Sequence, residues 1–335
     1  EMVDAVVESD RDILEYRLPE PDETIEAIAR NIATLIDDGS TIEVGIGNIP
    51  QTVLKYLADK NDLGVHTEMF NDAIMPLVDS GVINGRKKTI NRGKVTASFC
   101  YGTRKLYDYI HENQLFEFRP SEYVNDPFVI AQHNRMVGIN VAIEIDMTGQ
   151  VCSDSIGYDF YSGIGGQVDF NRGAARSRDG KAIIALPSTA KGGTVSRIVP
   201  RLTEGAGVVT TRGDIHYVVT EYGIAYLFGK SIRERVMELA AIAHPDYRND
   251  ILDEAKNRRY IDPDQKMLPE KSRYPAEYEE HKPLPDGTEL FYRPIKPTDE
   301  KMLRDMLYLC SERSIAFRFF KPLKAFPHRF FQEFT

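Results

Sequence analysis

A glycine-rich turn near residue 45 has the residue types and spacing to act on an anionic ligand. Gly45-Ile46-Gly47-Asn48-Ile49-Pro50 joins a predicted strand to a predicted helix, so its backbone N–H groups and the positive end of the helix dipole should point at one spot. Such a spot suits a phosphate group or a developing oxyanion. The turn departs from the dinucleotide pattern G-x-G-x-x-G because Pro50 stands at the third glycine position. A tight turn with packing glycines fits the spacing equally well.

An acidic residue, Glu68, follows about twenty residues later. It lies in His66-Thr67-Glu68-Met69, where a predicted strand ends, and this is the usual place for function in an α/β sheet. An exposed structural acid is the alternative. Glu144 and Asp146 compete with Glu68, because they share one face of a predicted strand and could form a carboxylate pair. A structural hydrogen-bonding role is favoured for those two.

Two further glycine clusters could contact a ligand. Gly163-Ile164-Gly165-Gly166 would let the backbone approach a ligand closely, although a flexible turn fits equally well. In Lys191-Gly192-Gly193 the lysine could meet an anion, although solvent exposure is favoured. The sequence has no G-x-x-x-x-G-K-[ST], H-E-x-x-H or G-x-S-x-G motif, and its 7 histidines are scattered. We therefore predict no metal site.

The composition is that of a soluble globular protein. The 335 residues carry a formal charge of −9, which disfavours nucleic acid and anionic membranes as partners. The three cysteines, Cys100, Cys152 and Cys310, lie far apart and indicate a reducing compartment without a disulfide framework. No apolar stretch approaches the length of a membrane span. We expect a cytoplasmic protein.

Strands and helices alternate along the first 260 residues, which predicts an α/β domain with a largely parallel sheet. Helices are expected over 22–35, from about Pro50, from about Asn71 and over 231–242. The strands expected are 41–44, 64–67, 141–146, 181–186, 207–210 and 217–220.

The composition changes after Tyr260. Prolines become frequent among charged residues, which predicts a linker over 261–287. Residues 288–335 are expected to form an incomplete α+β segment, with a strand over 290–295 and a helix over 299–310. We interpret the aromatic and basic residues at the end of the chain as core residues of a domain whose remainder is absent.

Six segments in consistent order resemble the acetyl-CoA hydrolase/transferase family, specifically the class I CoA-transferases of the 4-hydroxybutyrate type. The resemblance covers about residues 1–258, and it implies a C-terminal-half domain with helices on both faces of the sheet. It also implies a partner, the N-terminal half of the same protein, and a homo-oligomer is expected. The segments that carry it are Gly45–Pro50, His66–Met69, Asn140–Gly149, Gly163–Phe170, Thr220–Ala225 and Ile242–Arg248.

The resemblance assigns roles to these positions. Glu68 corresponds to the nucleophilic glutamate, and Asn140 and Gly163 correspond to contacts with coenzyme A. Gly165 and Gly166 would shape the thioester site. Coenzyme A enters as a substrate, and no metal or redox cofactor is expected. The loop that contacts coenzyme A corresponds to Gly45, Ile46, Gly47, Asn48 and Ile49.

The implied reaction is transfer of coenzyme A from an acyl-CoA to a small carboxylic acid through a glutamyl-CoA thioester on Glu68. Hydrolysis of acyl-CoA is the nearest alternative. A non-catalytic CoA-binding module that regulates an acetyltransferase is a second, and an NAD(P)-dependent dehydrogenase is a third that Pro50 disfavours. Residues 291–299 resemble the opening of a GNAT-type acetyltransferase, but the pyrophosphate loop of that fold does not follow. We therefore predict no acetyltransferase chemistry from this chain.

Overall fold

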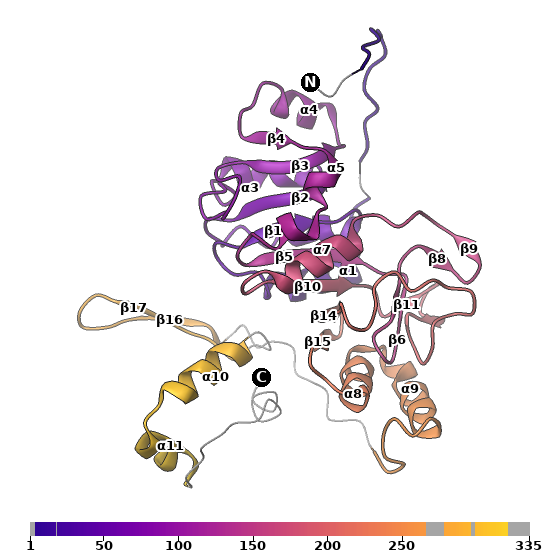
Figure 1. Ribbon diagram of the computed structural model, residues 1–335, viewed down its shortest axis with the longest axis vertical. Coiled ribbons are helices and arrows are strands. Elements are labelled where there is room, and N and C mark those ends of the chain that lie inside the picture. Colours follow the sequence, from indigo (N-terminus) through magenta and orange to yellow (C-terminus); the bar gives the residue numbers. More distant parts are fainter. Residues whose placement is uncertain (1–3, 18, 266–277, 296–298, 321–335) are drawn as a thin grey trace. The chain divides into compact units, whose positions relative to one another are not determined.

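The computed structural model describes residues 4–17, 19–265, 278–295 and 299–320 (Figure 1). The chain divides into two compact units, Glu1–Leu268 and Pro269–Thr335. The first unit contains an eight-stranded sheet and holds every residue to which the sequence assigned a role.

The sheet has the order β15-β14-β10-β5-β1-β2-β3-β4, and every neighbouring pair is parallel except β14 and β15. This confirms the predicted α/β fold with a largely parallel sheet. The strands are β1 (Thr41–Val44), β2 (Gly64–Phe70), β3 (Val95–Cys100), β4 (Phe116–Phe118), β5 (Met136–Val141), β10 (Lys181–Ala185), β14 (Tyr217–Thr220) and β15 (Gly223–Tyr226).

The strand order reverses between β1 and β5. From β1 the chain builds outward to β4, then returns to place β5 on the other side of β1 and builds outward to β15. In open parallel sheets, ligands bind beyond the carboxyl ends of the strands at such a reversal. The topology therefore singles out the ends of β1 and β5.

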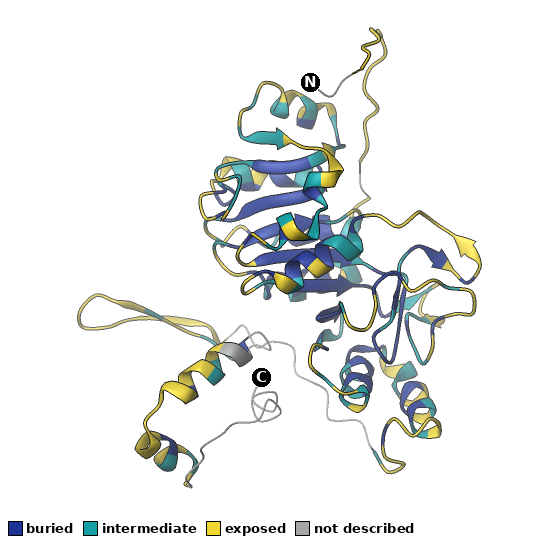
Figure 2. Cartoon of the chain, in the orientation of Figure 1, coloured by how far each residue is buried: buried dark blue, intermediate teal, exposed yellow. Residues whose placement is uncertain are grey.

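Helices cover both faces of the sheet, as Figure 2 shows by the buried strands between them. Val137 and Ile139 of β5 join the core on one face, whereas Met136 joins the core on the other, as expected for alternating side chains. The first face carries α1 (Glu23–Ala33), α2 (Asn48–Leu54), η1 (Asp72–Ile74), α3 (Met75–Asp79) and α4 (Arg104–Ile110). The second carries α5 (Ser121–Val124), α6 (Pro127–Ile130) and α7 (Gln167–Arg176).

Capping residues fix the starts of two predicted helices. The Asp22 carboxylate accepts a hydrogen bond from the Ile25 amide at 2.8 Å and begins α1. Ser231 and Glu234 form a reciprocal capping box at the start of α8 (Ile232–Ile242). Both helices lie where the sequence predicted them. The helix expected from about Asn71 is instead a short 3-10 turn followed by the five-residue α3.

A second layer of small strands packs with α8 and α9 (Pro245–Asn257) around a separate apolar cluster that includes Ile145, Ile198 and Leu239. The small strands with residues in this cluster are β6 (Glu144–Asp146), β7 (Val151–Cys152) and β13 (Ile198–Val199). Two separate two-stranded sheets are formed by β8 (Ser155–Ile156) with β9 (Asp159–Phe160) and by β11 (Thr189–Ala190) with β12 (Val195–Ser196). β13, β6 and β7 form one three-stranded sheet.

Two strand predictions in this region are wrong. Residues 141–146 are divided between two sheets, because the Ala142 amide donates to Ala185 in the large sheet and the next amide, of Ile143, donates to Cys152 in the small one. Residues 207–210 form no strand, because the amides of Val209 and Thr210 both donate to the Val151 carbonyl as an isolated bridge.

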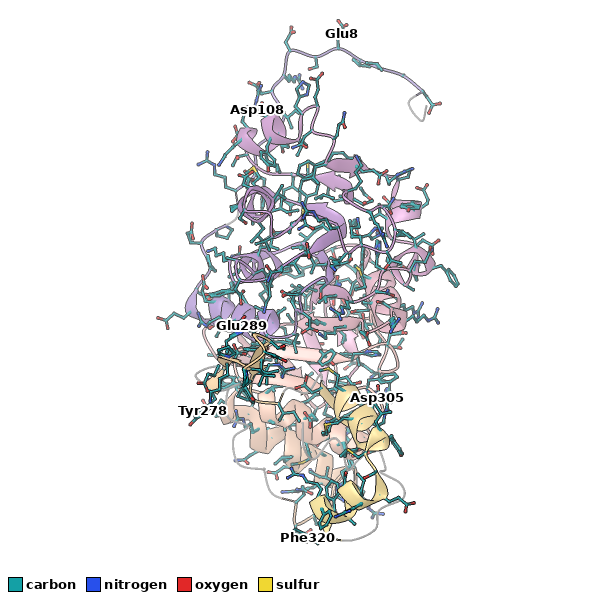
Figure 3. The ribbon with its side chains drawn as sticks, turned by 90° about the vertical axis from the view of Figure 1, so that its left-hand side faces the viewer. Glu8, Asp108, Tyr278, Glu289, Asp305 and Phe320 are labelled. Atoms are coloured by element: carbon teal, nitrogen blue, oxygen red, sulfur yellow. The ribbon has the colours of Figure 1, made fainter. Side chains whose placement is uncertain are left out.

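The N-terminal residues before α1 follow an extended path without a regular strand in the part that the structure describes. The Tyr16 amide donates to the Gly102 carbonyl at 2.9 Å, and the Tyr107 hydroxyl donates to the Leu14 carbonyl at 3.0 Å. Figure 3 shows the side chain of Glu8 on this segment beyond α4, which carries Asp108.

The second unit contains a β-hairpin of β16 (Glu280–Pro283) and β17 (Glu289–Tyr292), followed by α10 (Glu300–Leu309) and α11 (Glu312–Phe319). Figure 3 labels Tyr278 before the hairpin and Glu289 at the start of β17. Because β16 lies within 261–287, the linker prediction is wrong for that strand. The aromatic and basic residues from 321 onward lie outside the described residues. Among the described helices, none has the length and apolar character needed to cross a membrane.

Candidate active site

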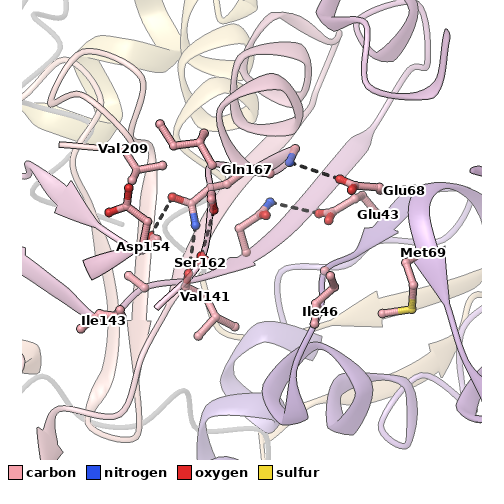
Figure 4. Close-up of a pocket in the computed structure, with 18 of the residues that line it drawn as sticks. Glu43, Ile46, Glu68, Met69, Val141, Ile143, Asp154, Ser162, Gln167 and Val209 are labelled. Carbon is pink, nitrogen blue, oxygen red and sulfur yellow. Dashed lines mark hydrogen bonds between the residues drawn. The ribbon is translucent and has the colours of Figure 1, made fainter. Parts of the chain in front are cut away.

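A cavity of about 440 Å³ lies beyond the carboxyl ends of β1, β2 and β5, at the reversal in strand order. Figure 4 shows it with the acidic side chains of Glu43 and Glu68 next to each other. It is lined by Glu43, Val44, Gly45, Ile46, Glu68, Met69, Asn140, Val141, Ala142, Ile143, Ser153, Asp154, Ser162, Gly163, Ile164, Gly165, Gly166, Gln167, Arg197 and Val209.

Strand register places three polar side chains of this cavity on one face of the sheet. Glu43 of β1 pairs with Gly138 of β5, so Asn140, two residues further along β5, projects from the same face. The pairing of β1 with β2 puts Glu43 beside His66, and Glu68 follows two residues later. The Glu43 side chain extends toward β5, where its Oε2 accepts a hydrogen bond from the Ile139 amide.

One oxygen of Glu68 is held by two donors. Glu68 Oε2 accepts hydrogen bonds from Asn125 Nδ2 at 2.9 Å and from the Gly166 amide at 3.2 Å. Gly166 also caps the ten-residue α7, whose positive dipole end favours a carboxylate there. No hydrogen bond to Glu68 Oε1 occurs among the residues that the structure describes, so one oxygen is anchored and the other is left to react.

Gly166 is required at its position by close approach. A Cβ atom there would lie 2.4 Å from Glu68 Oε2 and 2.8 Å from Asn125 Nδ2. The main-chain N–H therefore reaches the carboxylate only because no side chain intervenes. Apart from their chain neighbours, no described residue has an atom within 4 Å of a Cβ placed on Gly163 or Gly165, so those two glycines leave open space in the cavity wall.

A buried histidine, His66, holds the main chain next to Asn125. His66 Nε2 donates to the Val124 carbonyl at 2.8 Å, next to Asn125 in the chain. Burial lowers the pKa of His66 to about 4, so the ring is neutral near pH 7. The sequence did not predict a role for Asn125, which lies in an irregular stretch between α5 and α6.

Glu43 is a second residue of the site to which the sequence assigned no role. It is 2% exposed, and its Oε2 accepts hydrogen bonds from the Ile139 amide at 2.7 Å and from Asn140 Nδ2 at 3.1 Å. Burial, with a further contribution from the negative charge of Glu68, raises the pKa of Glu43 to about 8 despite these two donors. A charged residue type between Ile42 and Val44 in a fully buried strand was the available signal.

The remaining walls combine apolar side chains with polar groups that are already paired. Gln167 accepts a hydrogen bond from Ser153 Oγ at 2.9 Å and donates to the Val141 carbonyl at 2.9 Å, which ties α7 to the end of β5 (Figure 4). Burial lowers the pKa of the Arg197 guanidinium, and nearby Glu221 opposes that shift. The apolar lining includes Ile46, Met69, Val141, Ile143 and Ile164.

The structure brings together seven of the ten predicted site residues: Gly45, Ile46, Glu68, Asn140, Gly163, Gly165 and Gly166. Gly47, Asn48 and Ile49 do not line the cavity. Ile49 is buried in the core beneath the turn, and Asn48 lines a different cavity of about 320 Å³. These residues lie away from the carboxyl end of β1 because they form the start of α2.

The competing acidic residues have structural partners. Glu144 accepts hydrogen bonds from the amide and hydroxyl of Thr203, at 2.7 and 2.8 Å. Asp146 accepts from Thr148 and Gln150 in the turn that follows it. Lys191 is exposed and does not line the cavity. Within the described part of the chain, no group of three or more His, Cys, Asp or Glu side chains could hold a metal ion.

Residues 102–255 match the family model described as acetyl-CoA hydrolase/transferase C-terminal domain. This part of the chain is therefore similar to that domain. The matched range includes Asn125, Asn140 and Gly166, whereas Glu43 and Glu68 precede it.

Similarity to individual proteins extends beyond that range. The chain is 49% identical over 256 residues to 4-hydroxybutyrate coenzyme A transferase of Clostridium kluyveri, covering 76% of this chain and 60% of that protein. It is 52% identical over 240 residues to succinyl-CoA:acetate/propanoyl-CoA:succinate CoA transferase of Fasciola hepatica, covering 71% of this chain and 49% of that protein. The chain thus spans about half to three fifths of these relatives.

Solved structures confirm the α/β fold of the chain. The 4-hydroxybutyrate CoA-transferase of Porphyromonas gingivalis is 45% identical and superimposes with a TM-score of 0.67, covering 75% of this chain and 59% of that chain. RipA of Yersinia pestis is 40% identical with a TM-score of 0.71, covering 74% of this chain and 56% of that chain.

Proposed function

We propose that the protein transfers coenzyme A from an acyl-CoA to a small carboxylic acid, with Glu68 as the covalent nucleophile. The observation that carries the proposal is the asymmetric environment of Glu68, one oxygen anchored by Asn125 and Gly166 and the other open to the cavity. The names of the relatives as CoA-transferases support the reaction class.

In the first half of the reaction, Glu68 Oε1 attacks the thioester carbonyl, the C–S bond breaks and coenzyme A leaves as a thiolate. The product is a mixed anhydride between Glu68 and the acyl group. The thiolate then attacks the Glu68 carboxyl carbon, and the acyl group departs as a free carboxylate with the bridging oxygen. An enzyme-bound glutamyl-CoA thioester remains.

The anchored oxygen has a role in the second attack. When the thiolate adds to the Glu68 carboxyl carbon, negative charge develops on Oε2, where Asn125 Nδ2 and the Gly166 amide already donate. A preformed donor of this kind contributes about 3 kcal/mol to a transition state. An incoming carboxylate reverses both steps, so the Glu68 carboxylate is regenerated with no net proton change.

The cavity walls suit the remaining parts of the substrate. The apolar side chains of Val141, Ile143 and Ile164 can cover an acyl chain or the pantetheine arm of coenzyme A. The open space at Gly163 and Gly165 allows a thioester to lie close to the backbone. We propose acyl-CoA and small carboxylic acids as the substrates, with no further cofactor.

Intact mass of the full-length protein after exposure to acyl-CoA tests this proposal. We expect an adduct of the mass of coenzyme A that borohydride destroys, and Glu68→Gln should abolish it. Glu144→Gln is the matched control, because it changes a carboxylate that binds Thr203 outside the cavity. An adduct that persists in Glu68→Gln would refute Glu68 as the nucleophile.

Hydrolysis is the second candidate, because an acetyl-CoA hydrolase of Yarrowia lipolytica is 31% identical over 268 residues. Water would then intercept the anhydride or the glutamyl thioester. Release of free coenzyme A from acetyl-CoA with and without a second carboxylate separates the two reactions. Equal release in both would favour hydrolysis over transfer.

For the second unit, we propose an origin in the opening of a GNAT-type fold without acetyltransferase chemistry of its own. A strand followed by a helix, β17 and then α10, occurs in the order that this resemblance requires. Measurement of acetyl transfer from acetyl-CoA to amines by the isolated chain tests this, and the expected result is no product.

A further inference from the structure

Glu43 is the cavity group that the proposed reaction leaves without a role. It is part of strand β1, it is 2% exposed, and it lines the same cavity as Glu68. A buried carboxyl group is retained at a cost in solvation unless it is neutral or fully paired. Its environment therefore needs an explanation.

The hydrogen bonds of Glu43 leave one place for a proton. Both described donors, the Ile139 amide and Asn140 Nδ2, approach Oε2. Among the described residues, none donates a hydrogen bond to Glu43 Oε1. This includes Arg197, the one cationic side chain in the described cavity wall. A carboxylic acid with its proton on Oε1 and its Oε2 accepting two bonds fits this arrangement.

We propose that Glu43 is a positioning residue for the transfer reaction: as an uncharged acid it fixes the amide of Asn140 at the cavity and leaves Glu68 as the only charged member of the pair that Glu43 and Glu68 form. The inference rests on the proposed function of Glu68. The elevated pKa of Glu43, about 8, agrees with the neutral form at physiological pH.

The neutral form matters because both half-reactions place new negative charge near Glu68. Attack on a thioester or an anhydride creates an oxyanion and moves a thiolate, and an ionised Glu43 would repel both. Ionisation would also change the strength of the hydrogen bond that Asn140 Nδ2 donates to Glu43 Oε2. Activity should therefore fall as the pH rises through the pKa of Glu43.

Other charged groups near Glu43 do not give the same dependence. His66 is neutral in this range, because burial holds its pKa at about 4. Of the surrounding groups, Glu68 is the one whose charge raises the pKa of Glu43. Charged or titratable side chains on the surrounding elements include Glu68 and His66 on β2, Asp126 before α6, Asp154 after β7, Arg197 before β13, and Asp169, Arg172 and Arg176 on α7. Lys88, whose Nζ donates to the Val65 carbonyl of β2, has a pKa that burial lowers to about 7, so Lys88→Met in the same pH series separates its titration from that of Glu43.

The pH dependence of kcat for the full-length protein tests the inference. The native protein should lose activity about tenfold per pH unit above a pKa near 8, and Glu43→Gln should lack this limb, because glutamine keeps the acceptor oxygen but cannot ionise. Glu144→Gln is the matched control and should retain the limb. An unchanged limb in Glu43→Gln overturns the inference.

A second variant separates positioning from charge. Glu43→Leu removes the acceptor for Asn140, so kcat should fall at every pH, and adding Asn140→Ala should cost little more. Fully additive losses would overturn a role through Asn140. Infrared difference spectra of native protein against Glu43→Gln should show a protonated carboxyl band that disappears above about pH 8, a readout independent of turnover. If the Glu68→Gln adduct persists, the proposed function fails; if only the Glu43 tests fail, this inference fails alone.

Discussion

Replacing Gly166 by alanine is the sharpest perturbation of the proposed nucleophile. The new Cβ would lie 2.4 Å from Glu68 Oε2 and 2.8 Å from Asn125 Nδ2, so both groups must move. The backbone at Gly166 has φ −72° and ψ 0°, which alanine adopts without strain. The substitution therefore acts on Glu68 and not on the fold of α7.

The expected loss follows from the hydrogen bonds involved. An ordinary contact with the new methyl group requires the carboxylate to shift by about 1 Å, which breaks the bond between the Gly166 amide and Oε2, now 3.2 Å long. Loss of one such donor lowers kcat by about 100- to 1,000-fold, equivalent to about 3–4 kcal/mol. A misplacement of this size at the nucleophile alone costs about 100-fold.

Steady-state rates of CoA transfer and the rate of adduct formation, measured on the full-length protein, give the result. Gly213→Ala is the matched control, because its new Cβ would meet Thr211 Oγ1 at 3.6 Å, an ordinary contact, and Gly213 does not line the cavity. Thermal unfolding of both variants verifies that they are folded. We expect a large loss of kcat for Gly166→Ala alone. A folded Gly166→Ala protein with the native kcat would show that the geometry around Glu68 Oε2 does not contribute to the reaction.

Three further predictions concern stability. The pKa of Glu43 is raised on folding, so its ionisation opposes folding as the pH rises from 4.5 to about 8, and Glu43→Gln should raise the free energy of unfolding above pH 8 by about 3–5 kcal/mol in urea titrations. Burial lowers the pKa of His216 to about 4, so stability should fall as the pH drops from 6.5 to 4, and His216→Phe should show a shallower decline in thermal midpoint. Lys88→Met should cost about 3 kcal/mol, measured by urea unfolding, because two buried acceptors and one part-buried acceptor lose the Nζ donor. A native-like unfolding curve for any of the three would contradict the corresponding contact or pKa.

The parts of the fold that could be predicted are those with a local cause. Asp22 and Ser231 begin helices through their own side chains, and the apolar strand at 181–186 needs only its own residues to be recognised. The break between β5 and β6 could not be predicted in this way. Residues 139–145 are apolar at most positions, and the break arises because Ala142 and Ile143 donate to different sheets.

The residues of the site divide in the same way, into those with a local signal and those that depend on distant partners. Glu68 and Gly166 could be named because a glutamate at a strand end and a glycine cluster are visible in the sequence. Glu43 and Asn125 could not, because their roles depend on partners about 97 and 57 positions away, Asn140 and Glu68. Asn48 and Ile49 were included because the turn was treated as a unit, whereas the α2 helix directs them away from the cavity.

The location of β1 between the two halves of the sheet has a consequence for folding. Glu43 and Glu68 belong to strands made before β4, whereas Asn125, Asn140 and Gly166 all follow it. Pairing between parallel strands so distant in sequence forms slowly, so a growing chain holds both acidic side chains in water before the amides that orient them have arrived. The carboxyl group that we propose is acylated, that of Glu68, thus has both of its donors only once Asn125 and the start of α7 have been made and packed beside β2. An unfinished chain therefore has no means of consuming acyl-CoA.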